Sequence, residues 1–274
     1  MTKVLVTGGT GSLGRELTPR LLAAGYTVRI MSRRNPKPGE DARVEWVQAS
    51  LESGTGLSEA IKGVNVVVHA ASNPAKREVD VTGTARLLNE ARTAGVQQFV
   101  YISIVGIDRI GFSYYRNKLA AEHLIEASGL PWTILRATQF HEFIDRILGT
   151  LTRWPLAFIP TNWQFQSIST GEVAEQLAVA VQKGHMGRLP DIGGPEVLRF
   201  GDMAKAWLAA QGRHRPIVHL PLPGKLPAGF RQGFNTTPQN RVGKLTWSEW
   251  LQEHYSQPAL PEIISRKNEP SPNV

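Results

Sequence analysis

A glycine-rich segment near the N-terminus, Gly8-Gly9-Thr10-Gly11-Ser12-Leu13-Gly14, constrains the fold of this chain more than any other feature. The five residues before it, 3–7, have the apolar and β-branched composition of a strand. Residues 13–24 have the pattern of a helix, which Gly25 ends. The segment therefore predicts a strand, a tight turn and a helix whose first amides face a phosphate group.

Three of the four glycines in this loop each have a distinct expected role. Gly8 permits the tight turn, Gly11 lets the backbone approach a pyrophosphate without a Cβ in the way, and Gly14 permits close packing of helix on strand. The Ser12 hydroxyl can bind a phosphate oxygen or cap the helix, and Thr10 and Leu13 complete the loop. We expect this loop to bind a dinucleotide.

The first 136 residues alternate short apolar runs with helical patterns, which predicts a parallel sheet covered on both faces. The expected fold class is α/β, a doubly wound Rossmann-type sheet followed by a small C-terminal part. Further strands are expected at residues 26–31, 44–48, 64–69, 98–103 and 132–136. Helices are expected at residues 57–62, 79–94 and 114–128.

Beyond Arg136 the alternation changes, which suggests a second unit. We divide the chain into a dinucleotide-binding domain at 1–140, with contributions from about 165–195, a small substrate-binding part at 141–256 and a loose tail at 257–274. Expected helices cover 140–151, 200–210, 247–255 and a segment that Thr170 caps and that ends near residue 183. Expected strands cover 165–168, 188–192 and 217–220.

The end of the second strand indicates which dinucleotide is bound. Proteins that favour NAD place an acid there for the ribose 2′-hydroxyl, whereas an arginine accommodates a 2′-phosphate. This chain has Ser32-Arg33-Arg34, and the nearest acids, Glu40 and Asp41, lie further along the loop. A guanidinium can bind a phosphate through two parallel hydrogen bonds and stack on adenine. We therefore predict NADP(H) as the cofactor.

Composition narrows the remaining classes. The chain has no Cys, so disulfides and thiolate metal sites are excluded, and no metal site is predicted. The net charge of +8 comes from 31 Lys and Arg residues scattered among 23 Asp and Glu residues, a pattern that favours solvated surface charge over a nucleic-acid partner. Without an apolar stretch long enough for a signal peptide or a membrane span, a cytoplasmic protein is expected.

Three more segments complete a family resemblance: Val66-Val67-Val68-His69-Ala70-Ala71, Phe99-Val100-Tyr101-Ile102-Ser103 and Pro131-Trp132-Thr133-Ile134-Leu135-Arg136. With the glycine spacing, they resemble the extended and atypical short-chain dehydrogenase/reductase superfamily, in particular its NmrA-like, NAD(P)H-binding group, over roughly residues 2–185. That group includes quinone and dye reductases as well as redox sensors without turnover. The resemblance implies cofactor contacts beside adenine, ribose and nicotinamide at Ser50, Leu51, Ala70, Ala71, Ser72 and Ala137.

The same resemblance implies a catalytic Ser, Tyr and Lys. Tyr114 and Lys118 have the Tyr-x-x-x-Lys spacing that places both side chains on one helix face, and Ser103 ends the preceding strand. In this family the lysine binds the nicotinamide ribose and lowers the tyrosine pKa, so that the phenol can transfer a proton. His141 is an alternative proton donor.

The first hypothesis is therefore an NADPH-dependent reductase, an enzyme of the oxidoreductase class, acting on a quinone, carbonyl or other conjugated acceptor. Its small-molecule substrate is expected to be flat and apolar, since the candidate pocket walls are aromatic: Phe140, Phe143, Trp154, Phe158 and Trp163. One alternative is a non-catalytic NADP(H)-binding sensor with a protein partner, which the short stretch between Ser103 and Tyr114 favours. A nucleotide-sugar epimerase or dehydratase is a third, less favoured by these aromatics.

Overall fold

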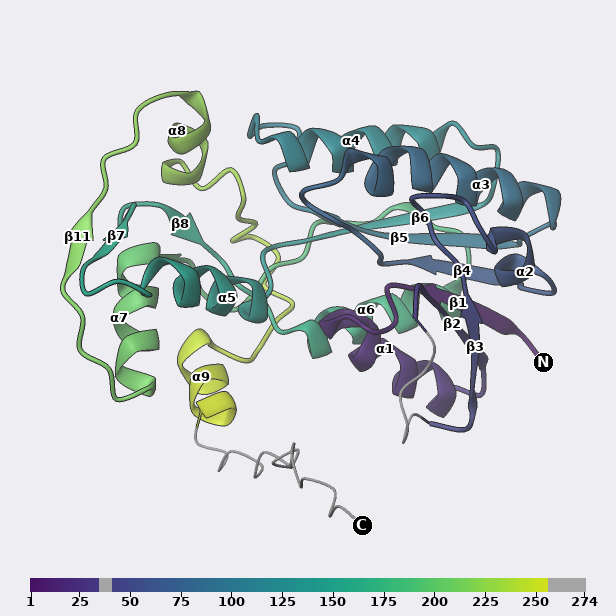
Figure 1. The fold of residues 1–274 in the computed structure, drawn as a ribbon, viewed down its shortest axis with the longest axis horizontal. Helices are drawn as coiled ribbons and strands as arrows, with labels where there is room; N and C mark the ends of the chain where they lie inside the picture. The colour runs from purple at the N-terminus through teal and green to yellow at the C-terminus, as the bar shows by residue number, and fades with distance from the viewer. Residues whose placement is uncertain (35–40, 256–274) are drawn as a thin grey trace, which may run out of the picture.

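The computed structural model describes residues 1–34 and 41–255, and its central feature is a sheet of seven parallel strands in the order β3-β2-β1-β4-β5-β6-β9 (Figure 1). The chain builds β1, β2 and β3 outward in one direction and then returns to add β4 on the other side of β1. The carboxyl ends of β1 and β4 therefore border the point where the strand order reverses, where doubly wound sheets bind ligands. The predicted Rossmann-type fold is confirmed. The strands are β1 (Lys3–Thr7), β2 (Thr27–Ser32), β3 (Val44–Gln48), β4 (Val66–His69), β5 (Gln98–Ile104), β6 (Trp132–Ala137) and β9 (Gly187–Arg188).

Helices cover both faces of this sheet (Figure 1). α1 (Ser12–Ala23) and α6 (Thr170–Lys183) pack against each other on one face, and α2 (Leu57–Ile61), α3 (Gly83–Thr93) and α4 (Ser113–Glu126) cover the other. Alternate residues of β1 enter the two cores, Val4 and Val6 one core and Leu5 the other. Burial on both faces explains why the central strands are almost continuously apolar.

The helix predicted at 79–94 is divided in the structure. A π-helical turn, η1 (Glu78–Thr82), comes first, and α3 follows it. In this turn the Asp80 carboxylate accepts hydrogen bonds from the Ser72 hydroxyl and the Asn73 amide, and the Thr84 hydroxyl donates to the Asp80 carbonyl. These side-chain bonds compete with a regular helical ladder, and π turns are often found at functional sites.

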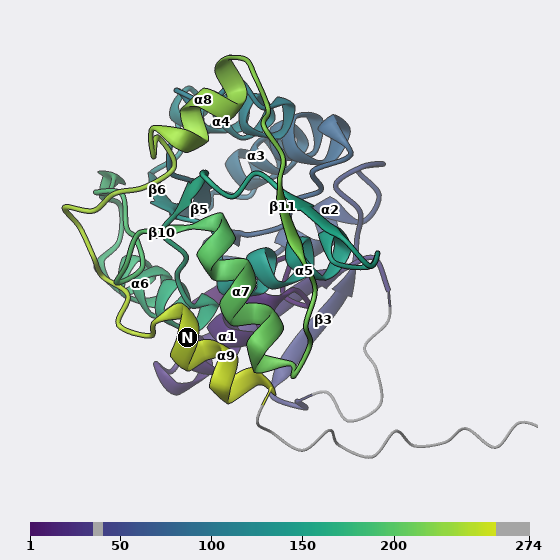
Figure 2. The same ribbon diagram turned by 90° about the vertical axis from the view of Figure 1, so that its left-hand side faces the viewer.

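The C-terminal part has its own core and lies beside the carboxyl ends of the strands (Figures 1 and 2). Buried Phe200, Trp207 and Trp247 contribute to this core. Its helices are α5 (His141–Leu151), α7 (Phe200–Ala210), α8 (Lys225–Arg231) and α9 (Trp247–Tyr255). Two small sheets pair β7 (Ala157–Ile159) with β11 (Ile217–His219), and β8 (Gln164–Phe165) with β10 (Leu198–Arg199).

Three expectations for this region need correction. The strand predicted at 165–168 is shortened to β8, because the Ile168 amide turns to donate to Gln139. The strand predicted at 188–192 is interrupted: β9 ends at Arg188 and Pro190 has no amide to donate, and the pairing with β6 resumes as a single parallel bridge between Ile192 and Ala137. Ser169, not Thr170, caps α6: its hydroxyl oxygen accepts from the Gly171 amide at 3.2 Å, whereas Thr170 donates to Glu142.

The predicted division of the chain at residue 140 stays an interpretation. α6 and β9, which come from residues 165–195, lie on the first unit's sheet. The tail predicted at 257–274 lies outside the described residues. Within residues 1–34 and 41–255, none of the helices combines the length and the apolarity that crossing a bilayer requires.

Candidate functional site

The phosphate loop has the close backbone packing that its sequence predicts. Gly8 adopts a φ of +72°, and its carbonyl accepts a hydrogen bond from the Gly11 amide at 2.9 Å. A Cβ at Gly14 would lie 2.4 Å from that carbonyl oxygen, and one at Gly8 would lie 2.8 Å from the Ala70 carbonyl. A Cβ at Gly11 would meet only the Gly8 carbonyl oxygen, at 3.3 Å. Packing therefore requires glycine at 8 and 14, while Gly11 keeps the ligand side open.

Beside this loop lies a cleft of about 410 Å³, bordered by the ends of β1, β2 and β4. It unites residues that are up to 71 positions apart in the chain, from Gly8 to Val79. Nine of the predicted cofactor residues line it: Gly8, Thr10, Gly11, Ser32, Arg33, Leu51, Ala70, Ala71 and Ser72. Its other lining residues were not among the site residues predicted from the sequence: Met31, Arg34, Ala49, Glu52, Asn73 and Val79.

The remaining predicted cofactor residues lie outside the cleft lining. Ser12 is exposed at the first turn of α1, while Leu13 is packed in the core. Ser50 accepts a hydrogen bond from the Ser53 amide at 3.3 Å, and Ala137 is buried at the end of β6. Gly14 lets α1 pack closely against the loop, which agrees with the close helix packing predicted for it.

Charge in the cleft is dominated by Arg33 and Arg34, both exposed. The cleft lining includes an acid, Glu52, which was not expected there because it comes from the segment after β3. Its carboxylate pairs with Lys76 at 2.7 Å, and this hydrogen bond lowers the pKa of Glu52. Glu40 lies outside the described residues. The end of β2 thus presents two guanidiniums near a carboxylate that already has a partner.

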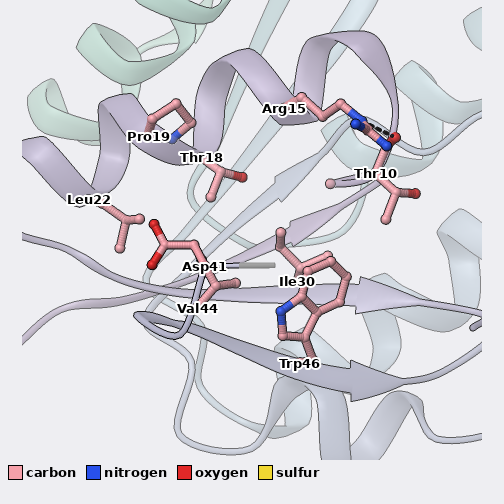
Figure 3. Close-up of a pocket in the computed structure, with 10 residues that line it drawn as sticks. Thr10, Arg15, Thr18, Pro19, Leu22, Ile30, Asp41, Val44 and Trp46 are labelled. Carbon is pink, nitrogen blue, oxygen red and sulfur yellow. Dashed lines mark hydrogen bonds between the residues drawn. The ribbon is translucent and has the colours of Figure 1, made fainter. Parts of the chain in front are cut away.

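A second, smaller hollow of about 170 Å³ lies on the other side of the loop, between α1 and strands β2 and β3 (Figure 3). Leu22, Ile30 and Trp46 give it apolar walls. Arg15 donates to the Thr10 carbonyl at 3.1 Å, the bond dashed in Figure 3. Asp41 lines this hollow and not the cleft, so it does not take the position of an acid that binds a ribose.

A buried hydrogen-bond chain supports the segment after β4. The Thr7 hydroxyl oxygen accepts from the amides of Ala70 and Ala71, each at 3.2 Å, and lies 2.7 Å from His69 Nδ1. His69 Nε2 lies 2.9 Å from the Thr84 hydroxyl, which donates to the Asp80 carbonyl. Burial lowers the pKa of His69 to about 3, so the ring is neutral and this chain holds the cleft-lining Ala70 and Ala71 in place.

Tyr114 is connected to the cleft through Ser72. The two hydroxyl oxygens are 2.8 Å apart, and the Ser72 hydroxyl donates to Asp80 Oδ1 at 2.5 Å. Burial raises the pKa of Tyr114 to about 12 and also raises the pKa of Asp80. The expected lowering of the Tyr114 pKa by Lys118 is therefore wrong for this structure.

Lys118 lies on the same helix as Tyr114 but is turned into the protein. Its side chain is buried, Nζ donates to the Ile102 carbonyl at 2.8 Å and lies 4.1 Å from the centre of the Tyr101 ring. Burial lowers the pKa of Lys118 to about 8, against the opposing charges of Asp80 and Glu122. Lys118 is not among the cleft-lining residues.

Ser103 is buried at the end of β5, and within the described residues its hydroxyl oxygen has no hydrogen-bond partner. Alternation along β5 puts it on the same face as Tyr101, the face that α4 covers. Its register partner on β6 is Arg136, which forms a buried bidentate pair with Glu122 at 2.8 and 2.6 Å. Ser103, Lys118 and this ion pair therefore share one side of the sheet.

His141 has a structural environment rather than that of a proton donor. It is fully buried, its two ring nitrogens lie 2.8 Å from the Ser167 hydroxyl and 3.2 Å from the Leu245 carbonyl, and Trp247 and Trp250 pack around it. Burial lowers its pKa to about 4. The alternative role proposed for His141 in the sequence is not supported by this position.

The aromatic residues expected to form a pocket do not lie together. Trp154 and Phe158 are 75% and 51% exposed, so they do not form pocket walls. Trp163 stacks on Phe230 at 4.6 Å, and Phe140 and Phe143 are partly buried against separate cores. The aromatic residues near Tyr114 include Tyr115, which is buried, and Phe112, which is 40% exposed, with ring centres 6.3 and 6.4 Å from that of Tyr114.

The fold and the cleft define an α/β protein that binds a dinucleotide at a strand-order reversal. A family model described as NAD(P)H-binding matches residues 8–183, and the chain belongs to that family. The resemblance drawn from the sequence is thus confirmed, as is an NAD(P)H cofactor. Two of the proteins to which the chain is similar are named as a reductase and as an NADPH-dependent quinone oxidoreductase.

The chain is 28% identical over 278 aligned residues to (4-alkanoyl-5-oxo-2,5-dihydrofuran-3-yl)methyl phosphate reductase of Streptomyces griseus, covering 94% of each protein. The fold is similar to that of an NADPH-dependent quinone oxidoreductase from Escherichia coli, solved with NADPH: TM-score 0.75, 18% identity, 92% of this chain and 99% of that one. A nucleoside-diphosphate-sugar epimerase from Staphylococcus aureus has a TM-score of 0.72 at 18% identity, covering 92% of this chain and 100% of the other.

The residues present fit such a cofactor. Gly11 leaves its ligand side free of a Cβ, and as N-cap of α1 it offers no side chain to the first helical amides, which can then bind phosphate. Sequence reasoning missed Asp80 and Thr7, and of these only Thr7 had a usable signal. Thr7 and His69 end neighbouring parallel strands in register, and such pairs can be anticipated once the strand order is assumed.

Proposed function

We propose that this protein is an NADPH-dependent reductase that transfers a hydride to a carbonyl, quinone or other conjugated acceptor. The observation that carries the proposal is the contact between Tyr114 and Ser72, because Ser72 lines the cleft and Tyr114 is the side chain that can supply a proton there. The full-length similarity to a protein named as a reductase supports the same reaction class.

Arg33 supports NADPH over NADH. It lines the cleft at the end of β2, where a ribose 2′-phosphate lies in proteins of this fold. With Glu52 paired to Lys76, no described carboxylate at this position is left to favour a free 2′-hydroxyl. Gly8, Gly11 and the first amides of α1 would hold the pyrophosphate, and Ala70 and Ala71 would lie along the ribose.

When bound, the cofactor supplies the hydride, and the protein has to supply one proton to the acceptor oxygen. We assign this proton to the Tyr114 hydroxyl, whose pKa of about 12 keeps it protonated at neutral pH. Ser72 and Asp80 can restore it: a proton passes from the Asp80 carboxyl to Ser72 while the Ser72 proton passes to Tyr114. The acceptor oxygen gains the Tyr114 proton, and Asp80 is left as a carboxylate.

The environment of Asp80 suits this role. Burial raises its pKa, so a larger fraction of the carboxyl is protonated near neutral pH than in water. Once Asp80 ionises, the Ser72 hydroxyl donates to the carboxylate, and Tyr114 donates to Ser72 instead of to a substrate. Carbonyl reduction should therefore decrease as pH rises through the raised pKa of Asp80.

Substrate shape is proposed from the surroundings of Tyr114. Phe112 lies edge-on to Tyr114 and to Tyr115, and Tyr115 lies 6.4 Å from Phe230. This row of rings leads from Tyr114 into the C-terminal part, and its exposed member, Phe112, offers an apolar surface. A flat, apolar acceptor suits such a surface better than a sugar.

The experiment is a comparison of Tyr114→Phe with wild type on a panel of quinones, aldehydes and ketones. Carbonyl reduction should decrease by roughly 10²–10⁴-fold with unchanged NADPH affinity, the usual contribution of a positioned proton donor. Asp80→Asn should lower carbonyl turnover less, because Tyr114 remains. Quinone reduction should be less affected by either change, since the product anion is already stabilised. Unchanged carbonyl turnover in Tyr114→Phe would refute the assignment.

One observation favours a second candidate, a sensor that binds NADPH without turnover and signals to a protein partner. Lys118 donates to a backbone carbonyl inside the protein and is not in the cleft lining, unlike a lysine that holds the nicotinamide ribose. A sensor would bind NADPH, reduce no acceptor of the panel and show no effect of Tyr114→Phe. The same experiment therefore separates the two.

A further inference from the structure

Four large apolar side chains are exposed on the small sheet formed by β7 and β11 and on the bend that leads into β7, far along the chain from the cleft. Trp154, Leu156, Phe158 and Val218 are 75%, 46%, 51% and 38% exposed. We call them the β7–β11 face. Such side chains are individually unremarkable on a surface, but a contiguous group marks an interaction site.

The strand geometry places two of them on one side, and the other two lie in the bend just before β7. Phe158 and Val218 are register partners in the parallel pair, so their side chains point to the same face. Trp154 and Leu156 precede Phe158 at two-residue intervals and are exposed like it, whereas the intervening Ala157 and the following Ile159 are fully buried. The small sheet is therefore apolar on both sides, although only its inner side has a core to cover it.

The face lies at one end of the molecule. In Figure 1, β7 and β11 are at the left end, on the far side of α5 from the seven-stranded sheet, and in Figure 2 β11 crosses the front of the molecule. This end is accessible to a large partner without passing through the nucleotide cleft.

The charges around the face are of one sign. Residues 146–171 and 203–248, which contain both strands and their loops, include no Asp or Glu. Arg153 precedes Trp154, and Arg215 lies two residues before β11. Arg213 donates to the Thr152 carbonyl at 3.2 Å, which brings a third guanidinium to the same loop. Within the described part of the chain, none of these three arginines forms an ion pair with an acid.

We propose that the β7–β11 face binds the surface of a bilayer that contains anionic lipid. An apolar group with an exposed tryptophan at its edge suits the boundary between headgroups and acyl chains, where tryptophan is enriched. Neighbouring arginines without acidic partners are attracted to anionic headgroups. A nucleic acid would use the arginines but would leave Leu156, Phe158 and Val218 exposed to water.

The proposal does not depend on the proposed reductase function, because it concerns a surface and not the cleft. The tested protein is the full chain, incubated with vesicles of phosphatidylcholine, with or without phosphatidylglycerol, and separated by sedimentation. Wild type should bind the vesicles with phosphatidylglycerol, bind phosphatidylcholine alone much more weakly and be released by salt.

Two variants test the two components of the face. Arg153→Gln with Arg215→Gln should lower the partition coefficient roughly 10- to 30-fold, since each charge near an anionic surface contributes about a fivefold factor. Phe158→Glu should lower it roughly tenfold or more, because it removes an inserted ring and adds a repelled charge. The control for the arginine variant is Arg92→Gln with Lys183→Gln, which also removes two positive charges but elsewhere on the surface. The control for Phe158→Glu is Met186→Glu, which puts a carboxylate at another exposed apolar residue.

NADPH binding verifies that every variant is folded, since none of these residues lines the cleft. The proposal is supported if the controls bind vesicles like wild type and the face variants do not. It is overturned if wild type ignores anionic vesicles, or if control and face variants lose binding equally. Binding of wild type to a single-stranded oligonucleotide or to polyglutamate, without vesicle binding, would overturn it in favour of a nucleic acid or an acidic protein.

Discussion

The two halves of the molecule each bury a histidine with a lowered pKa, and the two differ in where their hydrogen bonds lead. His69 contacts Thr7 and Thr84, and Thr7 continues to the amides of Ala70 and Ala71 in the cleft. His141 contacts Ser167 and a backbone carbonyl, among tryptophans. A buried, neutral histidine is common to both, so its pKa does not identify a site. The site is identified instead by the groups that the histidine's hydrogen-bond network reaches.

Charged groups show a similar contrast. In the first half, Arg136 and Glu122 are buried together between β6 and α4, with Asp108 3.3 Å from the same guanidinium. In the C-terminal half, long segments contain only basic charges, and these lie at the surface. In the first arrangement each charge depends on its buried partner, so that removal of one leaves the other desolvated and unpaired, whereas the second leaves charge available to a partner.

The largest expected effect tests this contrast in charge. Glu122→Ala leaves the Arg136 guanidinium buried with only the half-exposed Asp108 near it, and should lower the free energy of unfolding by about 3–5 kcal/mol. Urea unfolding followed by circular dichroism measures this change. The control is Lys205→Ala in the exposed pair with Asp202, which should stay within about 0.5 kcal/mol of wild type. Similar losses in the two variants would contradict the contrast.

The next effect concerns the loop that makes the first half a nucleotide-binding unit. Gly11→Val puts a branched side chain on the ligand side, so NADPH affinity should fall by ~100-fold or more, which is about 3 kcal/mol. The fold should survive, because a Cβ at Gly11 meets one atom at 3.3 Å. Gly14→Val, by contrast, should destabilise the protein, since its Cβ would overlap the Gly8 carbonyl. Calorimetry with NADPH and thermal unfolding separate the two results. Undiminished binding by folded Gly11→Val would mean that the loop is misassigned.

A somewhat smaller effect is expected at the end of β2. Wild type should bind NADPH at least about ten times more tightly than NADH, and Arg33→Ala should reduce that preference by about 1.5–3 kcal/mol, the scale of a hydrogen bond to a charged group. Titrations with both cofactors measure it. Arg43→Ala is the control, since Arg43 pairs with Asp41 and does not line the cleft. Equal affinity of wild type for NADPH and NADH would exclude the assignment of Arg33.

Much of the first half could be predicted because its signals are local. The glycine loop, the alternation of apolar runs with helices and the arginines after β2 each lie within a few residues, and the strand order follows from general rules of chain crossover. The π turn at Glu78–Thr82 could not be predicted this way, because it accompanies contacts of Asp80 with the loop after β4.

The candidate site shows the same limit. Spacing placed Tyr114 and Lys118 on one helix, but it could not show that Lys118 would donate to the Ile102 carbonyl or that Tyr114 would contact Ser72. Aromatic residues beyond Phe140 were assigned to a pocket by their type alone. Trp154 and Phe158 proved to be exposed, because β7 pairs with β11, some 60 residues further along the chain, and so turns them outward. Such long-range pairing of three-residue strands leaves little trace in sequence.

The smallest expected effect returns to the two histidines and concerns pH. The pKa of His69 is lowered to about 3 and that of His141 to about 4, from 6.5 in an unfolded chain. The unfolded state therefore binds more protons below pH 6.5, so the stability from keeping each ring neutral is fully present above that pH and is lost as pH falls towards the folded pKa. At pH 5.5 the stabilisation from each histidine should be lower by about 1.4 kcal/mol than at neutral pH.

His69→Gln and His141→Gln should each remove one proton from the slope of unfolding free energy against pH. Only His69→Gln should also weaken NADPH binding, because only its network reaches Ala70 and Ala71. Equal effects of the two variants on NADPH affinity would show that the networks do not differ in function.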